Sequence, residues 1–170
     1  FIALPKRGKS FWLINLGKRA LVGGAKVCHV TLEMSETKVI QRYYQSLFAM
    51  AKREGRYSQA RLELDELGRL IGISQVDLKP RLTFDDPRVW KKLIQRGRSW
   101  GVRLKNLLIR EFPTGALTIN GLKAYLDSLE AIEGFVPDLL IVDYGDLFHV
   151  DSRNYRLDLG QVYKELRGLA

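Results

Sequence analysis

The chain has 170 residues, 46% of them apolar, so it is long enough to bury one substantial core as a single globular domain. The net charge of +9 lies mostly in residues 52–110, which carry 15 Lys and Arg against 7 Asp and Glu. No apolar run approaches bilayer length and the first residues lack a secretory pattern, so we expect no membrane contact. The single cysteine, Cys28, cannot form an internal disulfide, which fits a reducing cytosolic compartment and a small core residue.

The first element along the chain has the pattern of a phosphate-binding loop. The stretch ALPKRGKS, residues 3–10, matches Ala or Gly, four residues, then Gly-Lys-Ser. Such a loop wraps a polyphosphate with backbone N–H groups, and a glycine permits the close approach that this requires. We expect Lys9 to reach the β- and γ-phosphates and Ser10 to hold Mg²⁺. The expected nucleotide contacts are Pro5, Lys6, Arg7, Gly8, Lys9, Ser10 and Phe11. The alternative for this stretch is a solvated basic turn.

Almost no strand precedes the loop. Residues 1–4 are therefore expected to be the last turn of a strand that began upstream, in a longer polypeptide. The loop is followed by FWLINLGKRALVGG, which predicts a helix with Leu13, Leu16 and Ala20 inward and a stop at the glycine pair. Trp12 falls among the apolar positions of this helix and is expected in the core.

The next stretch, KVCHVTLEMS, predicts a strand that ends at Glu33. Ser35 is a plausible N-cap of the helix that follows. This helix is expected to end near Gly55 and to bury one stripe of residues, namely Val39, Tyr43, Leu47 and Met50.

Residues 56–105 are helical in composition but are broken by glycines and prolines, so we predict a small helical insertion there. Its basic surplus favours a polyanionic partner, and the alternative is a solvated basic face. Beyond it, NLLIREF predicts a strand over residues 106–112. A turn and a helix follow, with four residues expected inward: Leu122, Leu126, Leu129 and Ile132.

VPDLLIVDY is the most apolar predicted strand and delivers Asp143 at its C-terminal end. Alternating strands and helices with unbroken apolar strands predict an α/β protein with a mainly parallel sheet covered on both sides. Ligands gather at the C-terminal edge of such sheets, so Asp143 is a candidate Walker B acid that holds Mg²⁺ opposite Ser10. The alternative role of Asp143 is a helix or turn cap.

ATP hydrolysis also needs a group that orients the attacking water. Many P-loop ATPases place a Glu directly after the Walker B Asp, but this chain has Tyr144 there. Glu33 ends another core strand and can face the same cleft, so we expect it to be the catalytic carboxylate beside Lys9. Its alternative role is a charge favourable to the next helix dipole, worth about 0.3 to 1 kcal/mol.

The order of the Gly-Lys-Ser loop, the Leu-Glu-Met-Ser segment and the Ile-Val-Asp-Tyr segment resembles the RecA-like ATPase domain of DnaB-type replicative helicases. The resemblance covers nearly the whole chain and implies an incomplete RecA-like P-loop NTPase domain over residues 1–170, with residues 56–105 as an insertion. It implies ATP and Mg²⁺ as cofactors, Glu33 as the catalytic carboxylate and Asp143 as the strand acid. It also implies single-stranded DNA, with RNA possible, as a partner, and a homo-oligomer, expected as a hexameric ring.

Within this resemblance the polar loop 151–156 lies where the family contacts DNA, and Arg153 and Arg156 are the expected contacts. The chain departs from the family by having Gly145 and Asp146 where Leu-Gln is common, and its end precedes the sensor residue and the basic residues that act across subunits. The fragment itself is therefore expected to be weakly active. The expected setting is the cytoplasm of a bacterium or phage-infected cell, or an organellar matrix.

Two other readings stay open at this point. A RecA-like recombinase or clock-type ATPase would share every motif used above. A non-catalytic regulator or loader would keep the fold and bind partners without hydrolysing ATP.

Overall fold

The structure is a computed structural model that describes residues 8–51, 57–78, 83–84, 86, 88–99, 104–150 and 154–169. The chain divides into two compact units, one formed by residues 1–43 and 97–170 and the other by residues 44–96. Each unit is described by itself. Within the described ranges, no helix is long and apolar enough to cross a membrane.

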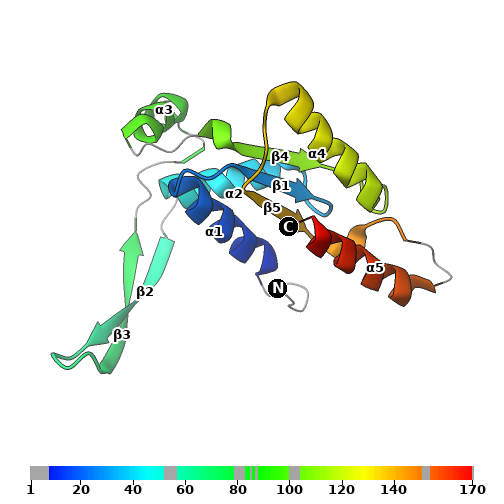
Figure 1. The fold of residues 1–170 in the computed structure, drawn as a ribbon. Helices are drawn as coiled ribbons and strands as arrows, with labels where there is room; N and C mark the ends of the chain where they lie inside the picture. The colour runs from blue at the N-terminus through cyan, green and yellow to red at the C-terminus, as the bar shows by residue number, and fades with distance from the viewer. Residues whose placement is uncertain are drawn as a thin grey trace. The chain divides into compact units, whose positions relative to one another are not determined.

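The helices and strands follow one another along the chain as shown in Figure 1. The helices are α1 (Lys9–Val22), α2 (Glu36–Phe48), α3 (Val89–Ser99), α4 (Ile119–Glu133) and α5 (Tyr155–Gly168), with short 3₁₀ turns η1 (Leu104–Asn106) and η2 (Gly145–Leu147). The strands are β1 (Val27–Thr31), β2 (Tyr57–Leu64), β3 (Leu70–Leu78), β4 (Leu107–Glu111) and β5 (Leu139–Asp143).

Three of these strands form a parallel sheet in the order β4-β1-β5. The register places Thr31 at the end of β1 beside Glu111 of β4 and Asp143 of β5. Parallel strands need crossover connections, and here each strand is joined to the next through a helix or a longer segment. The model therefore confirms an α/β chain with a parallel sheet flanked by helices, an arrangement that RecA-like domains share with other nucleotide-binding folds.

All five residues of β1 are buried, because helices cover both faces of the sheet. Side chains alternate along a strand, so β1 supplies two separate cores. One core joins β1 to α1, α2 and β5 through Ile14, Leu21, Val27, Val39, Tyr43 and Ile141. The other joins β1 to α4 and α5 and includes Cys28, Val30, Leu122, Leu129 and Val162. Cys28 is buried in this core, as predicted from the sequence.

The first core contains an unusually close contact between two helices. An added Cβ at Gly17 of α1 would lie 2.1 Å from the Tyr43 hydroxyl, so only glycine leaves room for this tyrosine. The hydroxyl lies 3.0 Å from Nδ1 of His29 on β1, and both side chains are fully buried. Burial lowers the pKa of His29 to about 4.

Local signals explain where α4 begins and ends. Thr118 is the N-cap and accepts a hydrogen bond from the Gly121 N–H at 3.0 Å. Gly134 follows the helix in the left-handed region with φ of 60°, and its N–H donates to the Glu130 carbonyl. Leu122 and Leu129 are buried and Leu126 packs on the core as predicted, but Ile132 is 82% exposed. The buried stripe of α4 therefore ends at Leu129, one turn before the predicted Ile132.

The stripe predicted for α2 is confirmed, since Val39, Tyr43, Leu47 and Met50 are all buried. This helix ends at Phe48, earlier than the expected Gly55, and Ala49 takes a positive φ of 51° directly after it. The predictions for Leu16 and Trp12 of α1 are wrong, because these side chains are 48% and 58% exposed. The apolar residues of α1 spread around the helix, and the sheet covers only one side of it.

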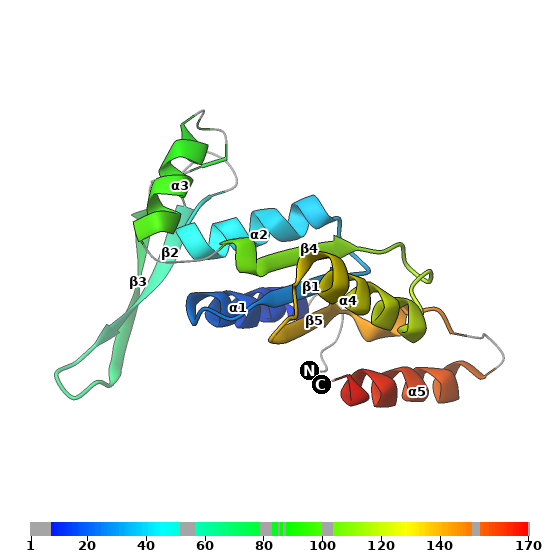
Figure 2. The same ribbon diagram turned by 45° about the horizontal axis from the view of Figure 1, so that its top comes forward.

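The predicted helical insertion over residues 56–105 is wrong for its first half. Residues 57–78 form an antiparallel hairpin of β2 and β3, seen as a long ribbon in Figure 2, and α3 is the α-helix among the described residues of this stretch. Leu and Glu favour helices individually, but RLEL, residues 61–64, alternates with the period of two that belongs to strands. The stretch DELG between them supplies the turn, with Gly68 at φ of 76°. The alternation was the signal that could have revealed the hairpin.

Candidate nucleotide site

A cavity of about 450 Å³ opens beside the start of α1. It is lined by Gly8, Lys9, Ser10, Phe11, Glu33, Met34, Arg42 and Tyr144. These residues come from the start of α1, the segment after β1, helix α2 and the residue directly after β5. The chain thus brings four predicted nucleotide contacts and Glu33 around one space. A cavity of this volume is within the usual range for small-molecule sites.

The backbone at the ends of β1 and β5 explains why Glu33 reaches this cavity. The Leu32 N–H donates to the Asp143 carbonyl at 3.0 Å, which extends the pairing of β1 and β5 to the edge of the sheet. The Thr31 hydroxyl donates to the Met34 carbonyl at 2.9 Å and accepts from the Met34 N–H at 3.1 Å. This pair of bonds turns the chain after β1, and the exposed Glu33 lies within that turn.

The start of α2 continues the same edge. The Ser35 carbonyl accepts hydrogen bonds from the N–H groups of Lys38 and Val39, as expected of the residue before a helix. The Glu36 N–H donates to Glu111 of β4 at 3.0 Å, so a neighbouring strand supplies a carboxylate to this helix end. These contacts hold α2 at the C-terminal edge of the sheet.

Lys9 is one of the cations that line the cavity, and its ammonium contacts Tyr144. Its Nζ lies 4.1 Å from the centroid of the Tyr144 ring, a cation–π contact. Gly8, directly before it, has φ of 80°, which glycine adopts without strain. Partial desolvation raises the pKa of Tyr144, and the negative charges of Glu33, Asp146 and Asp143 add to this in that order. Tyr144 therefore lies close to Lys9, to the predicted catalytic carboxylate Glu33 and to the predicted metal ligand Asp143.

Asp143 is fully buried at the end of β5, and neither of its carboxylate oxygens has a hydrogen-bond partner in the described part of the chain. A buried carboxylate without partners is costly, so such a group calls for a cation or ordered water. Mg²⁺ is typically bound by one or two protein oxygen groups together with substrate phosphates. The donors present, the Asp143 carboxylate and the Ser10 hydroxyl at the adjacent cavity, fit that chemistry.

Arg42 is a cavity residue that was not predicted from the sequence. Arg42 of α2 lines the cavity, and its guanidinium lies 5.0 Å from the centroid of the Phe11 ring. Phe11 was an expected nucleotide contact, whereas Arg42 was hidden within a helix predicted only for its apolar stripe. Arg42 lies six positions after Glu36, the first residue of α2, and so between one and two turns along this helix.

Gly145 and Asp146, the residues that depart from the Leu-Gln pattern, contact α5. An added Cβ at Gly145 would lie 3.1 Å from three atoms of the Tyr163 ring. The Tyr163 hydroxyl donates a hydrogen bond to Asp146. The Asp146 carboxylate therefore binds a tyrosine of α5, and Asp146 is not among the residues that line the cavity.

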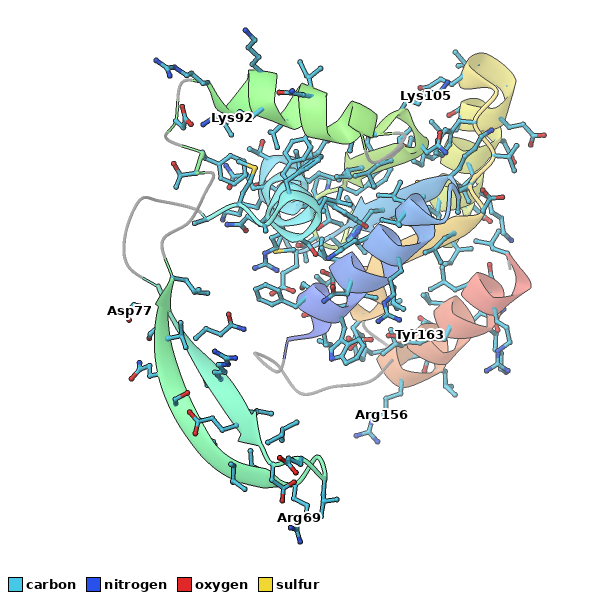
Figure 3. The ribbon with its side chains drawn as sticks, turned by 90° about the vertical axis from the view of Figure 1, so that its left-hand side faces the viewer. Arg69, Asp77, Lys92, Lys105, Arg156 and Tyr163 are labelled. Carbon is cyan, nitrogen blue, oxygen red and sulfur yellow. The ribbon has the colours of Figure 1, made fainter. Side chains whose placement is uncertain are left out.

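The remaining predicted residues lie apart from this cavity or outside the described ranges. Pro5, Lys6 and Arg7 fall within residues 1–7, and Arg153 falls within residues 151–153, so none of the four is described. Arg156 belongs to the first turn of α5 and is exposed, as Figure 3 shows together with Tyr163. The predicted loop 151–156 therefore ends in a helix.

Comparison with known proteins gives one informative match. The chain is 25% identical over 168 residues to a DnaB-like replicative helicase of Enterobacteria phage T4. The match covers 96% of this chain and 30% of the length of that helicase. No protein-family model matches the chain. The match supports a distant relationship to DnaB-like helicases.

Proposed function

We propose that the chain is part of an ATP-hydrolysing motor that acts on single-stranded nucleic acid, most plainly a replicative DNA helicase. The observation that carries this proposal is the cavity at the edge of the sheet, where Lys9, Ser10 and Glu33 meet next to the buried Asp143. The distant likeness to a DnaB-like helicase supports the same reading.

In this proposal each side chain has a separate task. Lys9 neutralises the β- and γ-phosphates of ATP, and its contact with Tyr144 keeps the ammonium at the cavity wall before nucleotide enters. Glu33 orients water, because it is exposed to the cavity and is held in a turn by Thr31 and Met34. Ser10 and Asp143 would hold Mg²⁺, which supplies charge neutralisation of the triphosphate when bound.

Arg42 extends this assignment. A guanidinium binds phosphate oxygens with a planar, two-pronged geometry, and Arg42 stands on the cavity wall contributed by α2. We assign it to the triphosphate, opposite Lys9. The two cations then make the cavity attractive to a polyanion, although Glu33 is also present there.

The proposed partner is single-stranded DNA, with RNA as the related alternative, and the proposed contacts are Arg153 and Arg156. Arg156 is exposed at the start of α5, where a phosphate can reach it. We further propose a homo-oligomeric ring, a hexamer, in the cytoplasm of a bacterium or phage-infected cell or in an organellar matrix.

The test is ATP turnover by the full-length protein with and without single-stranded DNA. Glu33→Gln should preserve nucleotide binding and abolish turnover, whereas Lys9→Ala should abolish binding. Glu130→Gln is the matched control, because Glu130 is exposed on α4, distant from the cavity residues, and should leave turnover unchanged.

Three results would overturn the proposal. Parental turnover in Glu33→Gln would remove this residue from catalysis. Absence of turnover in the parent, with and without DNA, would favour a non-catalytic regulator or loader. Turnover on DNA without any strand separation would favour a recombinase-like or clock-type ATPase.

A further inference from the structure

The hairpin of β2 and β3 exposes many large apolar side chains. Large apolar side chains that are at least 36% exposed occur along its length, namely Leu62, Leu64, Leu67, Leu70, Ile71, Ile73, Val76 and Leu78. Figure 3 shows the hairpin with Arg69 at its turn and Asp77 near its open end. Contiguous apolar patches of this kind mark protein interaction sites.

The strand register collects part of this surface on one face. Leu62 pairs with Ile73, and Leu64 and Ile71 lie two positions from them toward the turn. Side chains two positions apart along a strand share a face. These four side chains are 56% to 67% exposed. They form a continuous apolar face over the half of the hairpin next to the turn.

Hydrogen bonds to Asp65 hold the turn of the hairpin. Asp65 accepts hydrogen bonds from the N–H groups of Leu67 and Arg69 and from the Arg69 guanidinium, each at 2.8 to 2.9 Å. Hydrogen bonds from Arg69 are the main cause that lowers the pKa of Asp65. A two-stranded hairpin is only marginally stable in water by itself, so the β2–β3 hairpin gains stability from a partner that covers its apolar face.

The charge of the hairpin argues against nucleic acid as that partner. Residues 57–78 carry four acidic side chains against two basic ones, in a chain whose net charge is +9. The basic surplus of the middle of the sequence therefore lies outside the hairpin. An apolar, acidic surface fits a protein surface that is apolar and basic.

The outer side of α1 has those properties. Helix α1 contains no acidic residue, and Leu16 and Val22 are 48% and 62% exposed. Arg19 is exposed between them at helical spacing. Leu16, Arg19 and Val22 thus form an apolar and basic stripe that complements the hairpin in both respects.

We propose that the β2–β3 hairpin of one copy of this chain docks on the α1 stripe of a second copy. The apolar face at Leu62 and Ile73 covers Leu16 and Val22, and the acidic tip at Glu66 approaches Arg19. The inference deepens the proposed homo-oligomer and requires no catalytic activity. Helix α1 begins at Lys9, so docking at this stripe also links the contact between subunits to the helix that carries the phosphate-binding lysine.

The experiment measures self-association of the full-length protein by sedimentation over a range of concentrations, without nucleotide. Leu62→Ser with Ile73→Ser should raise the concentration needed for half-association at least tenfold. Both residues are exposed, so the fold should survive, which circular dichroism checks. Ile132→Ser is the control, because Ile132 is 82% exposed on α4 and should leave association unchanged.

A charge reversal tests the position of the contact. Glu66→Arg should weaken association. Adding Arg19→Glu to the same chain should restore it, because each contact then again joins a positive charge at position 66 to a negative charge at position 19. Parental association in the double serine variant, or failure of the reversed pair to restore it, would overturn the inference. ATP turnover is measured separately, so the association result can be interpreted even if the protein does not hydrolyse ATP.

Discussion

Gly17→Ala should destabilise the protein although alanine is the better helix former. The new Cβ would lie 2.1 Å from the Tyr43 hydroxyl, 2.9 Å from its Cζ and 3.1 Å from Cδ1 of Ile141. Tyr43 is fully buried and cannot swing into solvent, so α1 must move away or the tyrosine must leave its hydrogen bond with His29.

The magnitude follows from three terms. Overpacking a buried contact costs about 1 to 3 kcal/mol, and losing a buried hydrogen bond costs roughly 1 kcal/mol more. The higher helix propensity of alanine compared with glycine stabilises the folded protein by about 1 kcal/mol. We therefore expect the free energy of unfolding to fall by about 2 kcal/mol, measured by urea denaturation followed by circular dichroism at neutral pH.

The matched control is Gly160→Ala in α5, where an added Cβ meets nothing within 4 Å. This variant should gain stability by about 1 kcal/mol, because only the helix propensity changes. Tyr43→Phe removes the nearest atom, so Gly17→Ala should cost less in that background. A Gly17→Ala variant as stable as the parent, or equal costs in both backgrounds, would refute the packing argument.

Three further outcomes are expected. Burial lowers the pKa of His29 from 6.5 to about 4, so the unfolded chain binds this proton more tightly. Above pH 6.5 the contribution of His29 to the free energy of unfolding is fully present, and it should fall by roughly 3 kcal/mol as the pH drops to 4. Urea titrations at several pH values should show that His29→Gln flattens this pH dependence. Asp143→Asn should raise the melting temperature of the nucleotide-free protein, because it removes a buried charge without a partner among the described residues, and should abolish stabilisation by ATP with Mg²⁺; a destabilised variant that still responds to Mg²⁺ would contradict this. Tyr163→Phe removes the hydroxyl bound to Asp146 and should leave nucleotide affinity unchanged while reducing the stimulation of turnover by DNA, because α5 follows the predicted DNA loop; unchanged stimulation would leave that hydrogen bond with a structural role only.

Much of the parallel sheet could be predicted because its strands carry their own signal. VCHVT, LLIRE and LLIVD are short apolar runs separated by helical patterns, and only a covered parallel sheet buries such runs on both faces. The hairpin was missed because the Leu and Glu residues of β2 favour helices one by one, whereas the alternation of RLEL and the DELG turn favour a hairpin. Ile132, Leu16 and Trp12 were placed inside because periodicity identifies an apolar stripe but not how far the neighbouring layer extends over it.

The sequence alone determined the candidate chemistry, since Gly8, Lys9 and Ser10 form a phosphate-binding pattern and Glu33 and Asp143 end apolar strands. Only the tertiary structure decided that these strands are neighbours in register, which brings residues 110 positions apart to one edge of a sheet. It also decided that Arg42 and Tyr144 share the cavity and that Asp146 binds Tyr163 instead. The physical reason is that propensity and periodicity act over a few residues, whereas a site is set by the packing of elements that are far apart in the chain.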